Sequence, residues 1–224
     1  MCGRFALSAK TKQIEKLVPG IKSEIEITPR YNIAPSQNVL SVLNSNSLQL
    51  NFLKWGLIPF WSKDEKIGSK LINARIETVQ EKPAFRNSLK SKRCIIFADG
   101  FYEWDKNSSV GKIPYFIKLK SNEPFAFAGL WDSWKNTDNT VINSCSIITT
   151  QSNELMKNIH SRMPVILQNE IIQKWLSNDC FDMNLIEELK EPYSSDKMEM
   201  YRVSTIVNSP MNDNPLCTNI LYEN

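Results

Sequence analysis

The sequence predicts an α+β fold with a mostly antiparallel, barrel-like β core flanked by short helices. Strand-like runs rich in aromatic and β-branched residues dominate the middle of the chain. Short helical patterns punctuate these runs without the regular strand–helix alternation of a parallel sheet. Neither an internal repeat nor a linker interrupts the 224 residues, and one domain typically holds roughly 100–200 residues. We therefore expect a single domain over residues 1–224.

The chain is predicted to begin with a helix over residues 8–18. Ser8 has a side chain suited to the N-cap, and Pro19 followed by Gly20 ends the helical pattern. Residues 21–37 are expected to form a loop, because two prolines in this range exclude a regular element.

Strands and short helices are expected over the rest of the chain. Alternating or β-branched segments predict strands at residues 39–43, 48–55, 93–97, 101–104, 113–119, 124–131, 141–149, 163–167 and 198–203. The first two of these strands are joined by a polar turn over residues 44–47. Short helices are expected at residues 83–90, 170–176 and 183–189, the first with Pro83 at its first position, and a helical turn is expected at residues 153–159.

The composition is that of an ordinary soluble globular protein, with 42% hydrophobic and 23% charged residues. The net charge of +3 does not by itself indicate a nucleic-acid-binding protein, so basic groups for DNA would have to gather on one face. Five widely spaced cysteines without a C-x-x-C pair fit neither a disulfide framework nor a zinc site. No apolar stretch has signal-peptide or membrane length. We expect a cytoplasmic monomer without membrane, metal or cofactor.

The second residue, Cys2, can become the N-terminus itself once an aminopeptidase removes Met1. It would then carry an α-amine and a thiol on adjacent carbons, with reference pKa values near ~7.7–8.0 and ~8.5. Two such nucleophiles can attack one electrophilic carbon in turn and close a five-membered ring, which indicates an aldehyde as the target. The competing interpretation is a chance surface cysteine near a frayed chain end.

Two side chains could move protons in such chemistry. His160 is the only histidine of the chain, and histidine changes its charge near neutral pH, although a lone histidine often has a structural role. Glu103 lies among large aromatic residues. Strand alternation places it on the face of Phe101 and opposite both Tyr102 and Trp104. A carboxyl group beside aromatic bulk suits a general acid–base, whereas an exposed strand glutamate is the alternative.

Three further features could contact a substrate. Asn73 could orient a substrate oxygen or cap a short helix, and Arg75 is a candidate phosphate contact. An aromatic loop runs from Trp55 to Trp61. Its rings could stack on unpaired bases or cover an edge of the core.

Together these motifs resemble those of the SOS-response-associated peptidase (SRAP) family, which includes the HMCES-type abasic-site proteins. The resemblance runs from residue 2 to about residue 217 and depends on the order and spacing of linked motifs. The matching segments are Met1–Phe5, Arg30–Pro35, Trp55–Trp61, Asn73–Thr78, Arg93–Trp104, His160–Pro164 and Ser204–Asp213.

The resemblance implies the SRAP fold and a protein that crosslinks covalently to abasic sites during the DNA damage response. The implied partners are single-stranded DNA and single-strand/duplex junctions, so that the bound protein would be associated with the nucleoid. Cys2 would be the nucleophile, forming first an imine and then a thiazolidine. Glu103 would exchange protons and His160 would help to open the sugar and to reverse the adduct. Asn73 would fix the sugar or the Cys2 amine.

The resemblance also implies a set of DNA contacts. Arginines would grip phosphates beside the abasic nucleotide, and other residues would line the DNA groove or wedge against bases. The implied DNA-binding residues are Gly3, Arg4, Pro35, Trp61, Arg75, Thr149 and Arg162.

Three other functions stay open. The family name indicates a cysteine peptidase, whose activity would include autoproteolytic removal of Met1. N-terminal-nucleophile glutamine amidotransferases also begin Met-Cys-Gly, but here Arg4-Phe5 follows and the arginine- and glycine-rich substrate motifs of that class are missing. A DNA-binding module without a covalent step would bind undamaged and abasic strands equally well, even after Cys2→Ala.

Overall fold

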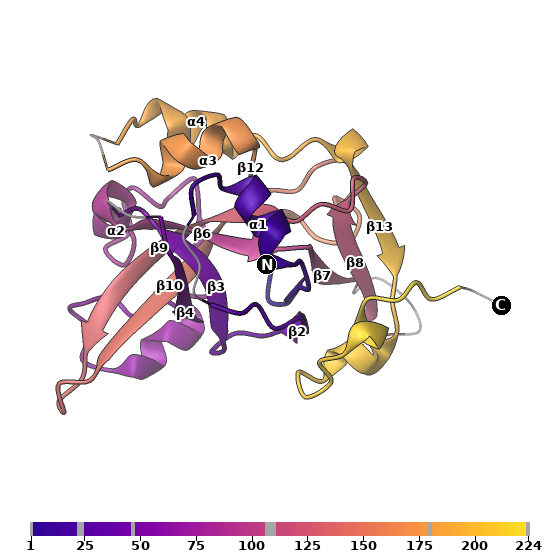
Figure 1. Ribbon diagram of the computed structural model, residues 1–224, viewed down its shortest axis with the longest axis horizontal. Coiled ribbons are helices and arrows are strands. Elements are labelled where there is room, and N and C mark those ends of the chain that lie inside the picture. Colours follow the sequence, from indigo (N-terminus) through magenta and orange to yellow (C-terminus); the bar gives the residue numbers. More distant parts are fainter. Residues whose placement is uncertain (1, 22–24, 46–47, 106–110, 179–180, 223–224) are drawn as a thin grey trace.

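Two β-sheets organise the protein in the computed structural model, which describes residues 2–21, 25–45, 48–105, 111–178 and 181–222. The larger sheet closes into a barrel, because its strand order β10-β4-β3-β6-β9 returns to β10 (Figure 1). The barrel strands are β3 (Asn38–Leu43), β4 (Leu50–Trp55), β6 (Arg93–Ala98), β9 (Phe125–Lys135) and β10 (Val141–Gln151). Neighbours in the barrel are antiparallel, apart from the parallel pair β4 and β10.

A second, antiparallel sheet has the order β13-β8-β7-β1-β2. Its strands are β1 (Phe5–Leu7), β2 (Arg30–Ile33), β7 (Gly100–Asp105), β8 (Ile113–Leu119) and β13 (Met198–Arg202). The ring of Phe5 lies 5.2 Å from that of Trp55 and 5.7 Å from that of Phe127, measured between centroids. Strand β1 therefore packs the second sheet against the barrel.

Short strands surround the last part of β10. Strand β5 (Asn73–Arg75) pairs with it in parallel and β11 (Arg162–Pro164) pairs with it antiparallel, whereas β12 (Ile166–Leu167) pairs with β9. Thr149 of β10 is in register with Arg75 of β5 and with Pro164 of β11. Two segments that are far apart in the sequence therefore meet on either side of β10.

The helices lie outside the sheets, with α3 and α4 at the top of Figure 1. They are α1 (Thr11–Leu17), α2 (Arg86–Ser91), α3 (Asn169–Leu176) and α4 (Asn184–Lys190), with the 3-10 helices η1 (Glu65–Lys70), η2 (Ser195–Lys197), η3 (Thr205–Asn208) and η4 (Pro215–Cys217). The indole N–H of Trp175 in α3 donates to the Cys94 carbonyl of β6 at 2.8 Å. Across the described ranges, every helix is too short or too polar to span a membrane.

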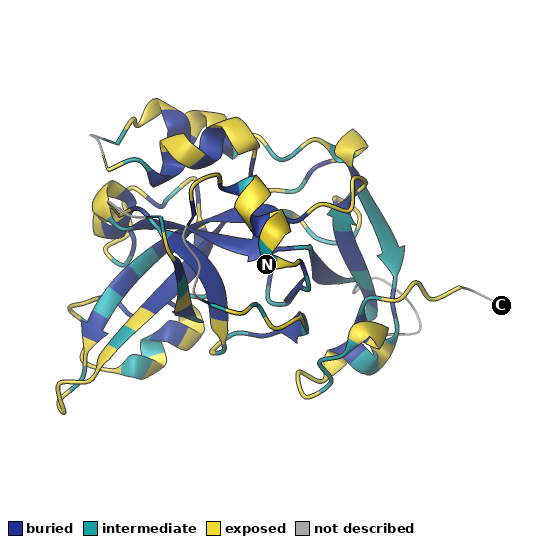
Figure 2. Ribbon diagram, in the orientation of Figure 1, coloured by how far each residue is buried: buried dark blue, intermediate teal, exposed yellow. Residues whose placement is uncertain are grey.

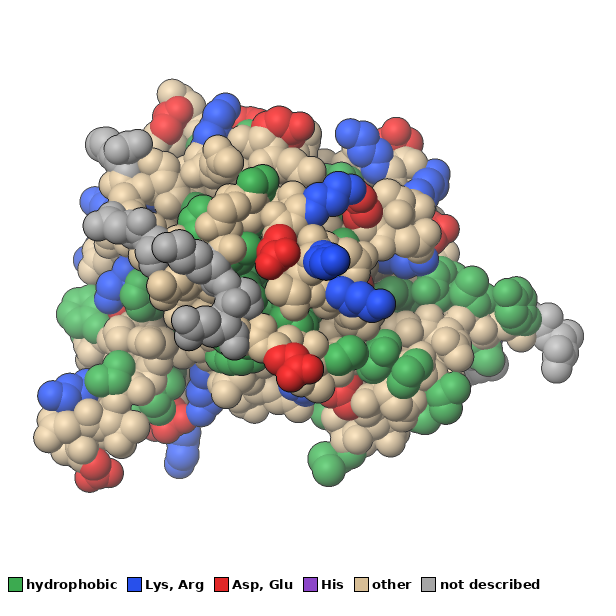
Figure 3. All heavy atoms as spheres, viewed as in Figure 1, with side chains coloured by type: hydrophobic (Ala, Val, Ile, Leu, Met, Phe, Trp, Pro, Cys, Tyr) green, Lys and Arg blue, Asp and Glu red, His purple; other side chains and the backbone are tan. Residues whose placement is uncertain are grey.

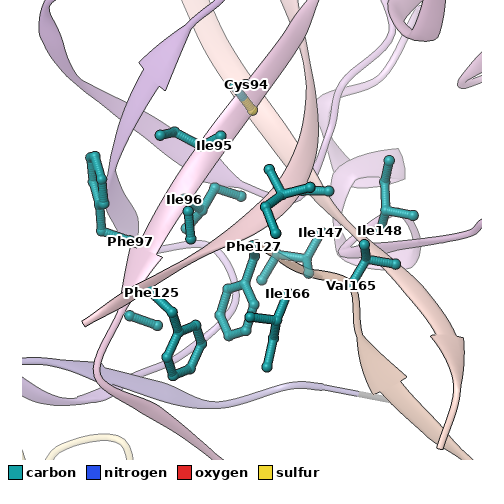
Figure 4. Close-up of a cluster of buried hydrophobic side chains, with 14 of the residues drawn as sticks. Cys94, Ile95, Ile96, Phe97, Phe125, Phe127, Ile147, Ile148, Val165 and Ile166 are labelled. Atoms are coloured by element: carbon teal, nitrogen blue, oxygen red, sulfur yellow. The ribbon is translucent and has the colours of Figure 1, made fainter. Parts of the chain in front are cut away.

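Apolar side chains fill the barrel and the space around it. Figure 2 shows long stretches of the barrel strands as buried. All six residues of β6 are buried, which requires cover on both faces because strand side chains alternate. Figure 4 shows Phe125, Phe127 and Ile166 gathered in this core. The Phe127 ring makes edge contacts with Phe125 at 5.3 Å and with Phe101 at 6.1 Å between centroids. Burial of this apolar surface is the main driving force for folding.

The predicted α+β class with an antiparallel barrel is confirmed, and the predicted strands recur with shifted ends. The predicted cap at Ser8 is wrong, because α1 begins at Thr11 and the Ser8 hydroxyl donates to the Asp99 carboxylate at 2.7 Å. The predicted loop over 21–37 is also wrong in part, since it contains β2. There, pairing with β1 prevails over the prolines on either side.

Smaller differences concern the helices and two positions outside the described residues. The helix predicted from Pro83 begins only at Arg86. The helical turn predicted at residues 153–159 is confirmed by hydrogen bonds such as that from the Lys157 N–H to the Asn153 carbonyl. The predicted strand 163–167 is divided between β11 and β12. Residues 46–47 of the predicted turn and the predicted removal of Met1 lie outside the described residues.

Candidate functional site

Cys2 lies beside β7, directly before β1. The register pairs Phe5 with Phe101, and the Tyr102 N–H donates to the Arg4 carbonyl at 2.9 Å, so the N-terminal segment runs antiparallel along β7. The side chain of Cys2 is buried, and its Sγ lies 3.9 Å from the Arg4 carbonyl oxygen. Burial raises the pKa of the Cys2 thiol, and the negative charge of Glu103 raises it further. The alternative of a surface cysteine is therefore wrong.

Asn73 holds the main chain of Cys2. Its Nδ2 donates to the Cys2 carbonyl at 2.8 Å, from the first residue of β5. The alternative role of Asn73 as a helix cap is wrong, because a strand follows it. The Oδ1 atom of Asn73 is buried and has no hydrogen-bond partner among the described residues. This amide therefore offers an acceptor beside the reactive residue.

Glu103 lies on the buried face of β7. Its side chain is 5% exposed, so the alternative of an exposed strand glutamate is wrong. The predicted alternation is confirmed: Phe101 belongs to the main core, whereas Tyr102 and Trp104 belong to a separate apolar cluster on the other face. Because Glu103 influences the Cys2 thiol electrostatically, the structure brings this carboxyl group close to the candidate nucleophile.

His160 is linked to this region through Arg162. The Arg162 N–H donates to His160 Nδ1 at 3.0 Å, and the Arg162 carbonyl oxygen lies 3.1 Å from the same nitrogen. The guanidinium group of Arg162 reaches across β10 and donates from Nη2 to the Thr149 carbonyl at 2.5 Å. It also forms an ion pair with Glu77, with Nη2 and Oε2 2.9 Å apart. The His160 segment is therefore tied to the chain that follows Asn73.

Arg4 is engaged within the protein rather than extended into solvent. Its Nη1 donates to Asn32 Oδ1 and to the Val207 carbonyl, both at 2.7 Å, and its guanidinium lies 5.7 Å from the Trp104 ring centroid. Burial lowers the pKa of Arg4. We call this arrangement the C-terminal clasp. It consists of Arg4, Asn32 and Asp213, together with the segment Thr205–Asp213 that they hold.

Hydrogen bonds from both ends close the clasp. The Asn32 side-chain amide donates to the carbonyls of Ser209 at 2.9 Å and Asn212 at 2.6 Å. The Asp213 carboxylate accepts from the N–H groups of Tyr31 at 2.5 Å and Asn32 at 2.9 Å. The carboxylate thereby pairs with N–H groups on the outer edge of β2. The clasp fixes β2, which is the neighbour of β1, and Cys2 lies directly before β1.

The other residues predicted to contact DNA differ in exposure. Trp61 is 48% exposed and Arg75 is also exposed, whereas Gly3 and Pro35 are half-buried. Thr149 is buried beneath Arg162, so a direct contact of DNA with its side chain requires movement of the groups above it. The DNA contacts stay predictions. On the face seen in Figure 3, side chains of both charges are interspersed and form no single basic patch.

Three residues of this region were missed by sequence reasoning, although each lies within a motif. Asn32, Glu77 and Asp213 belong to the segments Arg30–Pro35, Asn73–Thr78 and Ser204–Asp213. Their polar side chains were the available signal, but no local pattern shows which distant atoms they bind. Within the described ranges, no three His, Cys, Asp or Glu side chains gather as metal ligands would.

Comparison with known proteins identifies relatives over the whole chain. The family model described as "SOS response associated peptidase (SRAP)" matches residues 1–210. The chain is 50% identical over 218 residues to "Abasic site processing protein YoqW" of Bacillus subtilis, covering 96% of this chain and 97% of that protein. It is 31% identical to "Abasic site processing protein HMCES" of Gallus gallus, covering 97% of this chain and 77% of that protein.

A solved structure has the same fold. A crystal structure of a protein from Bacteroides thetaiotaomicron superposes with a TM-score of 0.88 at 29% sequence identity, covering 99% of this chain and all of that chain. The arrangement of barrel, second sheet and short helices is thus common to both proteins.

Proposed function

The chain belongs to the SRAP family, and from this premise we propose that it crosslinks covalently to abasic sites in single-stranded DNA through Cys2. Relatives named abasic site processing proteins support DNA as the substrate. The observation that carries the proposal is the 2.8 Å hydrogen bond from Asn73 Nδ2 to the Cys2 carbonyl, next to a buried thiol and Glu103. This arrangement fixes the residue that would bear both nucleophiles.

The proposed reaction takes place in two steps at one carbon. After removal of Met1, the α-amine of Cys2 adds to C1 of the open-chain abasic aldehyde, and loss of one water molecule gives an imine. The thiol then adds to the same carbon, and its proton passes to the imine nitrogen as the thiazolidine ring closes. Glu103 carries that proton. No oxidant or reductant is needed, because the carbon is neither oxidised nor reduced overall.

The protonated thiol fits this order of events. Burial raises the pKa of Cys2, which disfavours a thiolate as the first nucleophile. The amine therefore attacks first, and the thiol reacts only with the more electrophilic imine carbon. As the thiol proton passes to the imine nitrogen, the positive charge that forms there favours the ionised thiol, since an opposite charge nearby favours the charged state.

The same observation weighs against the alternative of a cysteine peptidase. A peptidase of this class begins with thiolate attack on an amide, which is a weaker electrophile than an imine. A thiol whose pKa is raised by burial is poorly suited to that first step. Crosslinking accordingly ranks above proteolysis.

The test is to incubate the purified protein with a single-stranded oligonucleotide that carries one abasic site. We expect a shifted band that survives heat and SDS, with a mass equal to protein without Met1 plus DNA minus one water. Cys2→Ala abolishes the band, whereas the control Cys217→Ala retains it. The proposal fails if no adduct forms although Met1 has been removed, or if Cys2→Ala still forms one. Cleavage of a peptide substrate that persists in the presence of abasic DNA would favour the peptidase.

A further inference from the structure

Glu77 is a charged residue to which the proposed reaction gives no role. It lies four positions after Asn73, at the start of the turns that follow β5. Its two carboxylate oxygens accept hydrogen bonds from the two terminal nitrogens of Arg162. Such a bidentate, charge-assisted pair is stronger and more restricted in geometry than a single hydrogen bond.

The Arg162 side chain spans three segments of the barrel sheet. It starts from β11, crosses β10 and ends at Glu77. Only 13% of this side chain is exposed. The Thr149 carbonyl accepts from Arg162 Nη2 at 2.5 Å and from the Ile76 N–H at 3.0 Å. One carbonyl oxygen thus binds both the arginine and the chain that leads to Glu77. The side chain is clamped between Thr149 and Glu77.

The main chain of Arg162 in turn contacts Nδ1 of the His160 ring and so influences which ring nitrogen carries the proton. When the Arg162 N–H donates to Nδ1 at 3.0 Å, a neutral imidazole must carry its proton on Nε2. When the ring is charged, Nδ1–H can donate instead to the Arg162 carbonyl, 3.1 Å away. The main chain of Arg162 therefore offers Nδ1 of His160 both a donor and an acceptor.

We infer that Glu77 is a positioning residue for His160 and acts through the guanidinium group of Arg162. The inference rests on the proposed function, because it concerns the proton transfers of crosslinking. Glu77 and Thr149 fix the Arg162 side chain, and this side chain holds the backbone that directs the imidazole. Loss of the Glu77 charge loosens the guanidinium group, which shifts the Arg162 main chain at the start of β11 and misdirects the ring.

A competing role for Glu77 gives a different kinetic result. If Glu77 only occupied Arg162 in place of a DNA phosphate, its neutralisation would tighten DNA binding. The rate of reaction within the bound complex would then stay the same. Positioning of His160 affects that rate and leaves binding almost unchanged.

The experiment is single-turnover crosslinking of the full chain to an abasic oligonucleotide over a range of DNA concentrations. We expect Glu77→Gln to lower the maximum rate constant about tenfold, as misplacement of a catalytic group does. The half-saturating DNA concentration should change less than about twofold. Glu81→Gln, an exposed glutamate of the same segment, is the matched control and leaves both quantities unchanged.

A double-mutant cycle with His160 supplies a readout that a purely structural role would not give. Ring opening also occurs slowly without a catalyst, so His160→Gln keeps a measurable rate. In that background we expect Glu77→Gln to have no further effect. If Glu77→Gln does not fold, Arg162→Lys tests the same link, because lysine keeps the charge but cannot form the bidentate pair.

Two results would overturn the inference while the proposed function stands. One is a full tenfold effect of Glu77→Gln in the His160→Gln background. The other is tighter DNA binding with an unchanged maximum rate. If the unmodified protein with Met1 removed forms no adduct at all, the proposed function itself fails.

Discussion

The barrel and the C-terminal clasp are held together by different forces. The barrel encloses buried rings and aliphatic side chains, each of which touches several others. The clasp depends on a few polar atoms, such as the Asp213 carboxylate on the N–H of Asn32, 181 residues away in the sequence. A substitution in the barrel therefore lowers stability according to the size of the cavity that it opens. Removal of a polar atom from the clasp instead removes the hydrogen bonds that this atom forms.

The candidate site lies between the barrel and the C-terminal clasp. Arg4 belongs to the clasp through its side chain, and its carbonyl accepts from Tyr102 N–H and lies 3.9 Å from Cys2 Sγ. Asn73 reaches the same Cys2 from the barrel side. Cys2 is thus positioned by apolar packing on one side and by polar contacts on the other.

The largest expected effect is in the barrel. Phe127→Ala should lower the free energy of unfolding by about 3–5 kcal/mol, because it opens a cavity among three other phenylalanine rings. Urea unfolding followed by circular dichroism measures it. Phe52→Ala is the control: that ring is 53% exposed on β4, and the change should stay within about 0.5 kcal/mol. Equal losses in the two variants would contradict an apolar basis for barrel stability.

A smaller effect is expected in the clasp. Asp213→Ala leaves the N–H groups of Tyr31 and Asn32 without their carboxylate acceptor, which should cost about 1–3 kcal/mol. The same urea titration applies. Met211→Ala changes a side chain of the same segment that is 90% exposed, and should have almost no effect. A cost for Asp213→Ala as large as that for Phe127→Ala would remove the distinction between the two regions.

The difference between the regions also explains what could be predicted from the sequence. The strands of the barrel are recognisable because local enrichment in β-branched and aromatic residues is enough to indicate them. Strand β2 was missed, since its stability depends on pairing with β1 and on the distant Asp213. The end of the first helix was placed correctly near Pro19, but its start was not, because Ser8 binds Asp99 instead.

The candidate site divides in the same way. Cys2 and Glu103 could be proposed from their own chemistry and from strand alternation. The roles of Glu77 and Asn32 could not, because each depends on a partner more than 25 residues away in the sequence. A sequence motif indicates that a residue belongs to the candidate site. Only the structure shows which atom that residue binds.

The smallest expected effect on stability concerns Asp99, at the junction of the two sheets. Asp99 precedes β7, accepts from the Ser8 hydroxyl at 2.7 Å, and has a buried Oδ1 without a hydrogen-bond partner among the described residues. Burial raises the pKa of Asp99 above its ordinary value of 3.8. The protonated form is therefore favoured by folding. This stabilisation is complete below the unfolded pKa and is lost as pH rises through the folded one.

Asp99→Asn removes that titration, so the variant should gain stability relative to the unmodified protein as pH rises through the raised pKa. The difference should be small, because two hydrogen bonds from Ser8 offset part of the burial cost. Urea unfolding of both proteins across acidic to neutral pH measures it, with exposed Asp138→Asn as the control. A pH-independent difference would show that the pKa of Asp99 is the same in the folded and unfolded protein, so that the hydrogen bonds from Ser8 fully offset its burial. The junction would then resemble the clasp, in which hydrogen bonds satisfy the Asp213 carboxylate, rather than the apolar clusters of the barrel.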